Sequence, residues 1–106
     1  MTPGKLTRYL LTPAAQADLE EIWLHTAHRW SPAQAERYID ALEQTFARLL
    51  AMPEMARERD EFTPPVRIHP GGAHLVIYRV ETDHLEILRI LGGRQDWLAI
   101  LRAADQ

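Results

Sequence analysis

The sequence contains no cysteine, and this absence excludes a disulfide framework, a thiolate nucleophile and a cysteine-based zinc site. No apolar run reaches the roughly 18 residues that a transmembrane helix needs. The segment from Met1 to Lys5 also lacks the apolar core of a signal peptide. These absences predict a cytoplasmic protein that neither spans a membrane nor is secreted.

Lysine is scarce as well, since Lys5 is the only lysine among the 12 basic residues and all the others are arginines. The net charge is −3, whereas a domain that wraps a phosphate backbone is usually basic. We therefore expect no direct sequence-specific nucleic-acid binding. Hydrophobic residues make up 46% and charged residues 25% of the 106 positions, which is typical of a globular chain with one core. We expect a single domain over residues 1–106.

Periodicity and capping residues predict a strand and two helices in the first half of the chain. Residues 5–11 alternate weakly and indicate a strand. Thr12 and Pro13 then start a helix whose apolar stripe ends near Trp30. Ser31, followed by a proline, starts a second helix that ends at Pro53. Because almost no linker separates the two helices, they should pack as an antiparallel hairpin.

The second half predicts a small sheet and a last helix. Residues 53–65 are polar and proline-bearing, which favours a loop. Three strands are expected at 66–69, 73–81 and 84–91, and a short helix at 95–103. The predicted fold class is α+β: an N-terminal strand, an antiparallel helical hairpin, a three-stranded antiparallel meander and a short C-terminal helix.

A two-residue turn at Thr82–Asp83 sets the expected register of the last two strands. The facing pairs would be Val80–Leu85, Arg79–Glu86, Tyr78–Ile87, Ile77–Leu88 and Val76–Arg89. In this register Arg89 and Tyr78 share one face, and Arg79 lies on the other with Glu86 as its ionic partner. Apolar residues on both faces indicate that both are partly covered.

Motifs for enzyme chemistry are weak. His25 and His28 share a helix face and His69 and His74 flank a turn, but no third ligand marks a metal site. The two glycine pairs match no nucleotide-binding fingerprint. Ser31 is assigned to a helix cap. We therefore expect no metal, no cofactor and no catalytic residue. Arg89 interrupts an apolar strand, so it snorkels, pairs with a buried carboxylate or serves function.

Three stretches, in this order and spacing, resemble the ParE toxins of the RelE/ParE superfamily. They are LTPAAQADLEEIW at 11–23, GAHLVIYRV at 72–80 and LEILRIL at 85–91, and the resemblance extends over residues 6–101. It implies a helical hairpin against a curved antiparallel sheet. It also implies a toxin of a type II toxin–antitoxin system, with a role in plasmid stabilisation, that binds and inhibits DNA gyrase without being an enzyme. A ParD-like antitoxin would neutralise the toxin in a hetero-oligomer.

The same superfamily contains RelE-type endonucleases that cut mRNA on the ribosome, and a non-toxic antitoxin-binding relative is a third alternative. Arg67 and Arg89 fall near basic positions that the RelE branch uses. However, residues 94–106 hold no tyrosine or histidine for acid–base work, which favours the ParE reading.

Two groups of contact residues are expected on this basis. The target should be bound by basic and aromatic side chains of the C-terminal half: Arg67, Arg89, Arg94 and Trp97. The helices and strands carry more large apolar residues than one helix pair and one sheet bury, so an antitoxin should cover part of them. The residues expected at that contact are Trp23, Trp30, Tyr38, Leu75 and Ile77.

Overall fold

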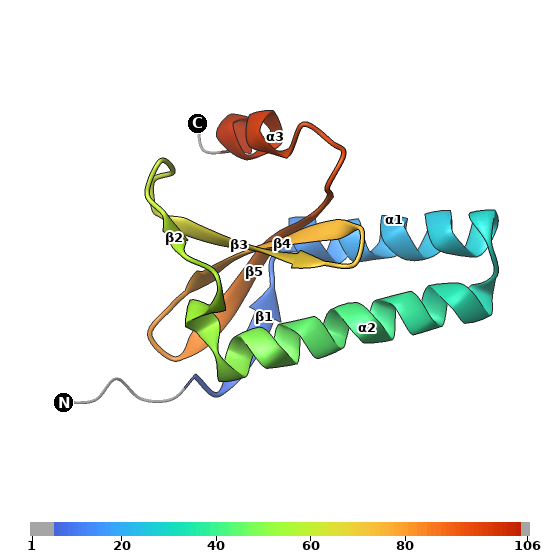
Figure 1. Cartoon of the computed structure of the whole chain (residues 1–106), viewed down its shortest axis with the longest axis horizontal. Coiled ribbons are helices and arrows are strands. Elements are labelled where there is room, and N and C mark those ends of the chain that lie inside the picture. Colours follow the sequence, from blue (N-terminus) through green and yellow to red (C-terminus); the bar gives the residue numbers. More distant parts are fainter. Residues whose placement is uncertain (1–5, 105–106) are drawn as a thin grey trace.

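The structure is a computed structural model that describes residues 6–104. The elements in chain order are β1 (Arg8–Leu11), α1 (Pro13–Arg29), α2 (Pro32–Ala51), the single 3-10 turn η1 (Pro53–Met55), β2 (Glu58–Arg59), β3 (Val66–Gly71), β4 (His74–Val80), β5 (His84–Gly92) and α3 (Trp97–Ala104). In Figure 1, α1 and α2 lie side by side as a hairpin that extends beyond the sheet, and α3 lies on the other side of the sheet. The predicted α+β order is confirmed, but the first strand begins at Arg8: Leu6 and Thr7 lie outside the strand, and Lys5, its predicted start, lies outside the described residues.

Both long helices begin at the predicted caps. The Thr12 hydroxyl accepts a hydrogen bond from the Ala15 backbone N–H at 3.1 Å, and the Ser31 hydroxyl accepts one from Gln34 N–H at 3.0 Å. A proline occupies the first turn of each helix, where its missing N–H costs nothing. Only two residues connect α1 to α2, so the helices fold back on each other.

The sheet has five strands in the order β1-β5-β4-β3-β2. The strand pair β1–β5 is parallel and the other pairs are antiparallel. The four residues of β1 pair with only the first part of β5, up to Leu11 opposite Ile87. The remainder of that edge of β5 therefore has to be satisfied by something other than a strand, and α1 lies beside it.

A bulge corrects the predicted register of β4 and β5. The pairs Val80–Leu85, Arg79–Glu86 and Tyr78–Ile87 are confirmed, but a shift between Ile77 and Tyr78 places Ile77 opposite Arg89 and Val76 opposite Ile90. The shift leaves Leu88 as the extra residue of β5. The prediction that Arg89 and Arg79 lie apart was therefore wrong, because both side chains line one pocket.

The expected ion pair between Arg79 and Glu86 is also absent, although the two residues do face each other across the strands. Arg79 Nη1 instead lies 4.0 Å from Glu81 Oε1, and Glu86 Oε2 lies 3.8 Å from His84 Nε2. The strand register thus does not decide which charged ends meet.

The predicted loop at 53–65 and the end of the third strand need correction. The loop contains η1 and the short strand β2, which pairs with Val66 and Arg67. Strand β3 does not end at His69 but continues through Pro70 to Gly71. Pro70 is tolerated because β2 pairs only with the start of β3, so Pro70 lies where β3 has a strand neighbour on one side only, β4.

Two hydrophobic clusters cover the two faces of the sheet, as expected. The larger one, with Phe46, Leu49 and Tyr78 at its centre, lies between the sheet and the helical hairpin. The smaller one joins Ile77 and Leu91 of the sheet to Leu101 of α3. The hydroxyl of the buried Tyr78 donates a hydrogen bond to Pro53 O at 2.7 Å, which ties η1 to the first cluster.

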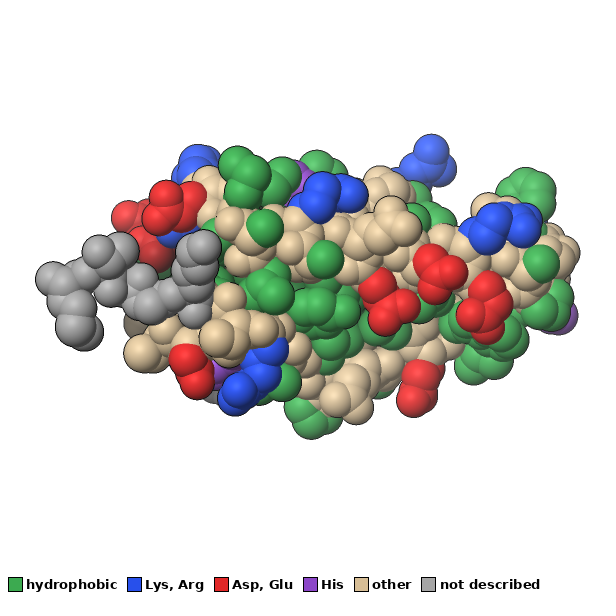
Figure 2. All heavy atoms as spheres, turned by 90° about the horizontal axis from the view of Figure 1, so that it is seen from below, with side chains coloured by type: hydrophobic (Ala, Val, Ile, Leu, Met, Phe, Trp, Pro, Cys, Tyr) green, Lys and Arg blue, Asp and Glu red, His purple; other side chains and the backbone are tan. Residues whose placement is uncertain are grey.

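One face of α2 carries a row of exposed acidic side chains. Glu36, Asp40 and Glu43 are exposed on α2 at spacings of four and three, which places them on one helix face. Figure 2 shows acidic side chains over the helical end of the molecule with hydrophobic side chains between them. Within residues 6–104, no helix is long and apolar enough to cross a membrane.

Candidate functional site

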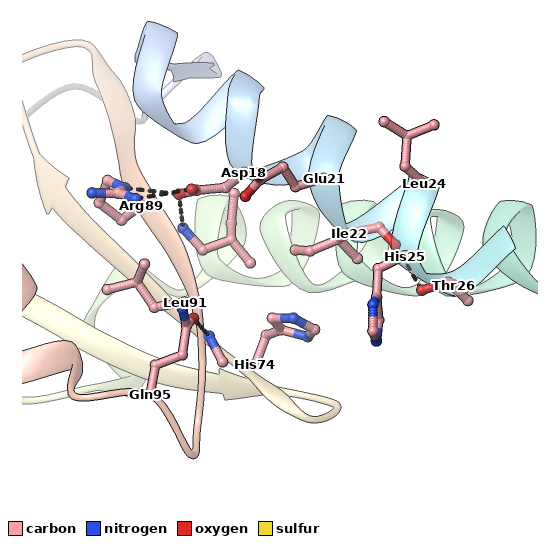
Figure 3. Close-up of a pocket in the computed structure, with 12 residues that line it drawn as sticks. Asp18, Glu21, Ile22, Leu24, His25, Thr26, His74, Arg89, Leu91 and Gln95 are labelled. Carbon is pink, nitrogen blue, oxygen red and sulfur yellow. Dashed lines mark hydrogen bonds and ion pairs between the residues drawn. The ribbon is translucent and has the colours of Figure 1, made fainter. Parts of the chain in front are cut away.

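A hollow, here called the α1–β5 cleft, lies where α1 passes the end of β5. It has a volume of about 680 Å³. Charged and imidazole side chains from three elements line it: Asp18, Glu21 and His25 of α1, His74 of β4 and Arg89 of β5. Figure 3 shows them together with the apolar side chains of Ile22, Leu24 and Leu91.

A buried ion pair closes one end of the cleft. Arg89 donates two hydrogen bonds to Asp18, from Nε to Oδ2 at 2.8 Å and from Nη2 to Oδ1 at 3.0 Å. The same Oδ2 accepts the backbone N–H of Ile90 at 2.9 Å. The hydrogen bonds to Asp18 raise the pKa of Arg89, so its guanidinium stays charged. Of the three readings of Arg89, the structure therefore shows pairing with a buried carboxylate.

The position of Asp18 follows from the shortness of β1. Beyond the last residue of β1, Thr12 N–H donates to Ile87 O at 3.0 Å and the Thr12 hydroxyl donates to Leu88 O at 2.8 Å. One turn and a half further along α1, Asp18 receives the N–H of Ile90. The helix cap and the carboxylate thus replace the missing strand neighbour of β5.

A second set of polar contacts closes the opposite wall. The Tyr38 hydroxyl accepts the Ala73 N–H at 2.9 Å and lies 2.7 Å from His74 Nδ1. This geometry suits a hydroxyl that donates to Nδ1 of a neutral imidazole. Burial lowers the pKa of His74, and His25 lowers it further, against the opposing effect of Asp18. We name these three residues, Tyr38, Ala73 and His74, the Tyr38 latch, because they hold the β3–β4 turn against α2.

The cleft is suited to binding rather than to proton transfer. Asp18 and Arg89 neutralise each other, and the Nδ1 atom of His74 is occupied by Tyr38. Within the described part of the chain, no group of three His, Cys, Asp or Glu side chains is placed to hold a metal ion. The arrangement offers an apolar wall with one exposed carboxylate, Glu21, at its rim.

The residues predicted to contact a target have different surroundings. Arg67 donates from Nη1 to Ala56 O at 2.6 Å and is therefore tied to the segment after η1. Arg94 is exposed between β5 and α3. Trp97 packs into the smaller cluster, and Arg59 stacks on its ring at 5.6 Å from the centroid.

The residues predicted to contact an antitoxin are also divided. Trp30 is 71% exposed at the hairpin corner, and Trp23 donates from Nε1 to Glu36 at 3.2 Å across the two helices. Tyr38 belongs to the latch. Leu75 and Ile77 lie in the cluster beneath α3, where Ile77 is fully buried and offers no surface to a partner.

Asp18 was not singled out from the sequence, where a carboxylate early in a helix is typically one that favours the helix dipole. Asp18 is instead buried and lies beyond the first turn of α1. A signal was available: Asp18 falls on the same stripe as the buried Ala15 and Ile22, at spacings of three and four. A carboxylate on a buried stripe and an arginine inside an apolar strand are natural partners.

Comparison with known proteins finds a family model and relatives that match this chain. The family model described as "ParE toxin of type II toxin-antitoxin system, parDE" matches residues 9–97. Toxin ParE1 of Mycobacterium tuberculosis is 43% identical over 91 residues, covering 85% of this chain and 93% of the relative. Toxin ParE of Escherichia coli is 41% identical over 102 residues, covering 95% and 97%.

Among solved structures, a chain of the chromosomal ParDE TA system from P. aeruginosa superposes with a TM-score of 0.71. It is 22% identical and covers 83% of this chain and 96% of that one, so it supports the fold. The family model and the two relatives each cover most of the chain. The chain belongs to the ParE toxin family of type II toxin–antitoxin systems.

Proposed function

We propose that this ParE family member is a single-domain toxin that inhibits DNA gyrase by binding it, and that a ParD-like antitoxin neutralises it. The observation that carries the proposal is family membership over nearly the whole chain, residues 9–97. The activity is a matter of protein binding rather than of catalysis. The protein would bind both gyrase and the antitoxin in the cytoplasm.

The state of the arginines supports binding over ribonuclease chemistry. A RelE-type mechanism would need Arg67 and Arg89 as free cations beside a scissile phosphate. Arg67 is held by a backbone carbonyl, and Arg89 is neutralised by Asp18. Arg89 therefore offers no uncommitted charge to a phosphate, although the Arg67 guanidinium keeps its net charge.

The hairpin supports a protein partner. Leu24 is 62% exposed and Trp30 71% exposed, both near the end of the hairpin that extends beyond the sheet. A large exposed tryptophan side chain is a residue type that often contributes much of the binding energy of a protein interface. We place the antitoxin contact on this end of the hairpin, with Trp30 and Trp23 as contact residues, and the target contact on the exposed Arg94 with Trp97 behind it.

The proposal is tested by incubating purified toxin with gyrase and supercoiled DNA, and separately with ribosomes and mRNA. We expect cleaved DNA to accumulate on gyrase and the mRNA to stay intact. Arg94→Ala should weaken the gyrase effect, whereas Arg48→Ala on the exposed side of α2 should not. Cleavage of the mRNA at specific codons without any effect on gyrase would reverse the assignment.

A further inference from the structure

A second hollow, here called the two-arginine pocket, lies on the face of the sheet that α3 covers. Its volume is about 250 Å³. Phe62, Leu88 and Leu101 form apolar walls, and the side chains of Arg79 and Arg89 enter it from β4 and β5. The β-bulge brings the two arginines together, because without the shift between Ile77 and Tyr78 they would lie on opposite faces of the sheet.

One N–H donor of the Arg79 side chain lacks the hydrogen-bond acceptor that a buried donor normally has. Its Nε atom is buried and has no hydrogen-bond partner among the described residues. Among residues 6–104 its one ion pair, to Glu81, is at 4.0 Å and involves Nη1. Buried N–H donors are almost always paired, because an unpaired one loses its hydration without compensation. The Nε atom is closed to solvent, so an acceptor from outside the chain would meet the Arg79 guanidinium at its Nη atoms, on a side chain that is 27% exposed.

The charges of the pocket define that acceptor. Asp18 already neutralises Arg89, so the pocket offers one guanidinium that is weakly compensated. One guanidinium matches one carboxylate, which can bind the two Nη atoms in a bidentate pair. A phosphate dianion would keep an unmatched charge against apolar walls, which is costly.

We propose that the two-arginine pocket binds a segment of a polypeptide partner in which an acidic residue has an apolar neighbour. The carboxylate of the acidic residue is the group that the pocket recognises. Arg79 holds the carboxylate, and Phe62, Leu88 and Leu101 receive the apolar neighbour. The site does not depend on whether gyrase is the target, since it follows from the pocket alone.

The test uses the purified full chain and two blocked peptides, acetyl-Leu-Glu-Leu-amide and acetyl-Leu-Gln-Leu-amide, with inorganic phosphate as a third probe. We expect the Glu peptide to raise the melting temperature by about 5 °C near saturation, because it binds only the folded state. We expect the Gln peptide and phosphate to raise it by less than about 1 °C. The Arg79 Nε–H resonance should shift with the same saturation curve.

Two variants separate binding from structure. Arg79→Gln should keep the melting temperature of the unliganded protein, since it removes an unpaired donor, but should lose the response to the Glu peptide. Arg102→Gln, an exposed position on α3, should respond like the unchanged chain. A loss of stability in Arg79→Gln that Arg79→Lys rescues without peptide would assign Arg79 a structural role and overturn the proposal. An equal response to both peptides, or a larger response to phosphate, would also overturn it.

Discussion

Asp18 receives three hydrogen bonds from β5, and this one side chain both neutralises Arg89 and completes the edge of the strand. Such a residue is hard to replace, because each of its partners is left unpaired when it is removed. The family resemblance contains Asp18 within its first stretch, but its role became visible only when β5 was placed beside α1.

Replacement of Asp18 by alanine should therefore destabilise the fold. Removing one partner of a buried pair costs about 3–5 kcal/mol. Since the Arg89 side chain is 26% exposed, solvent screening reduces the expected loss to about 2 kcal/mol. Urea unfolding of Asp18→Ala measures it, with the exposed Glu20→Ala on the same helix as control. An Asp18→Ala protein as stable as the control would show that the pair contributes nothing.

His74 should make stability depend on pH. Its folded pKa lies below the ordinary value of 6.5, mainly because of burial. The unfolded chain therefore binds more protons in the interval between the two values, and stability rises with pH across it. The stabilisation is complete above pH 6.5 and is lost as the pH falls through the folded pKa.

Urea midpoints measured from pH 5 to pH 7.5 test this expectation. The other titratable and charged side chains that line the cleft or contact His74 are kept in the variant described next. They are Asp18, Glu21 and His25 of α1, Arg89 of β5 and Tyr38 of α2. His74→Asn retains an acceptor for Tyr38 but does not titrate, so its pH profile should be flatter than that of the unchanged chain. Parallel profiles for the two proteins would remove His74 as the source.

At the scale of elements, the β3–β4 turn depends on Gly72. Its φ is +61°, in the left-handed region, and a Cβ there would lie 2.7 Å from the Tyr38 hydroxyl. Gly92 and Gly93, by contrast, have no left-handed backbone angle. The turn and the Tyr38 latch thus require the same glycine for two reasons, backbone conformation and close approach.

Gly72→Ala should cost about 2 kcal/mol, from the left-handed conformation and the displaced Tyr38 hydroxyl together. Gly93→Ala is the matched control, because its added Cβ would meet only Ala73 O at an ordinary 3.5 Å. Thermal unfolding of both variants compares them. If Gly93→Ala proved as damaging as Gly72→Ala, the latch would not be the reason for the glycine.

At the scale of the whole molecule, the hairpin extends away from the sheet and exposes apolar side chains at its far end. A ParD-like antitoxin that covers them should bind only the folded toxin. At 100 times its dissociation constant, it should stabilise the toxin by about 2.7 kcal/mol. Thermal unfolding with and without the antitoxin gives this shift.

Trp30→Ala is the informative variant in that experiment. Because Trp30 is 71% exposed, the change should leave the stability of the free toxin unaltered and reduce the antitoxin-dependent shift. Met52→Ala, 63% exposed at the other end of α2, serves as the control. A full shift in the Trp30 variant would move the antitoxin contact away from the hairpin corner.

The sequence by itself determined the elements and their order. Caps at Thr12 and Ser31, helical periodicity and β-branched runs are local signals, read over a few neighbouring residues. The turn at Thr82–Asp83 likewise determined the register of β4 and β5 as far as Tyr78 and Ile87, because register is set at the turn.

Only the tertiary structure decided how the cleft and the two-arginine pocket are built. The bulge at Leu88 shifts the register by one position. The use of Asp18 as a strand neighbour and the meeting of Arg79 with Arg89 join residues from different elements. Local sequence propensities do not specify contacts between distant residues or a one-residue shift in register. These contacts and this shift are settled by which buried N–H groups and charges must find partners once α1 and α3 cover the two faces of the sheet.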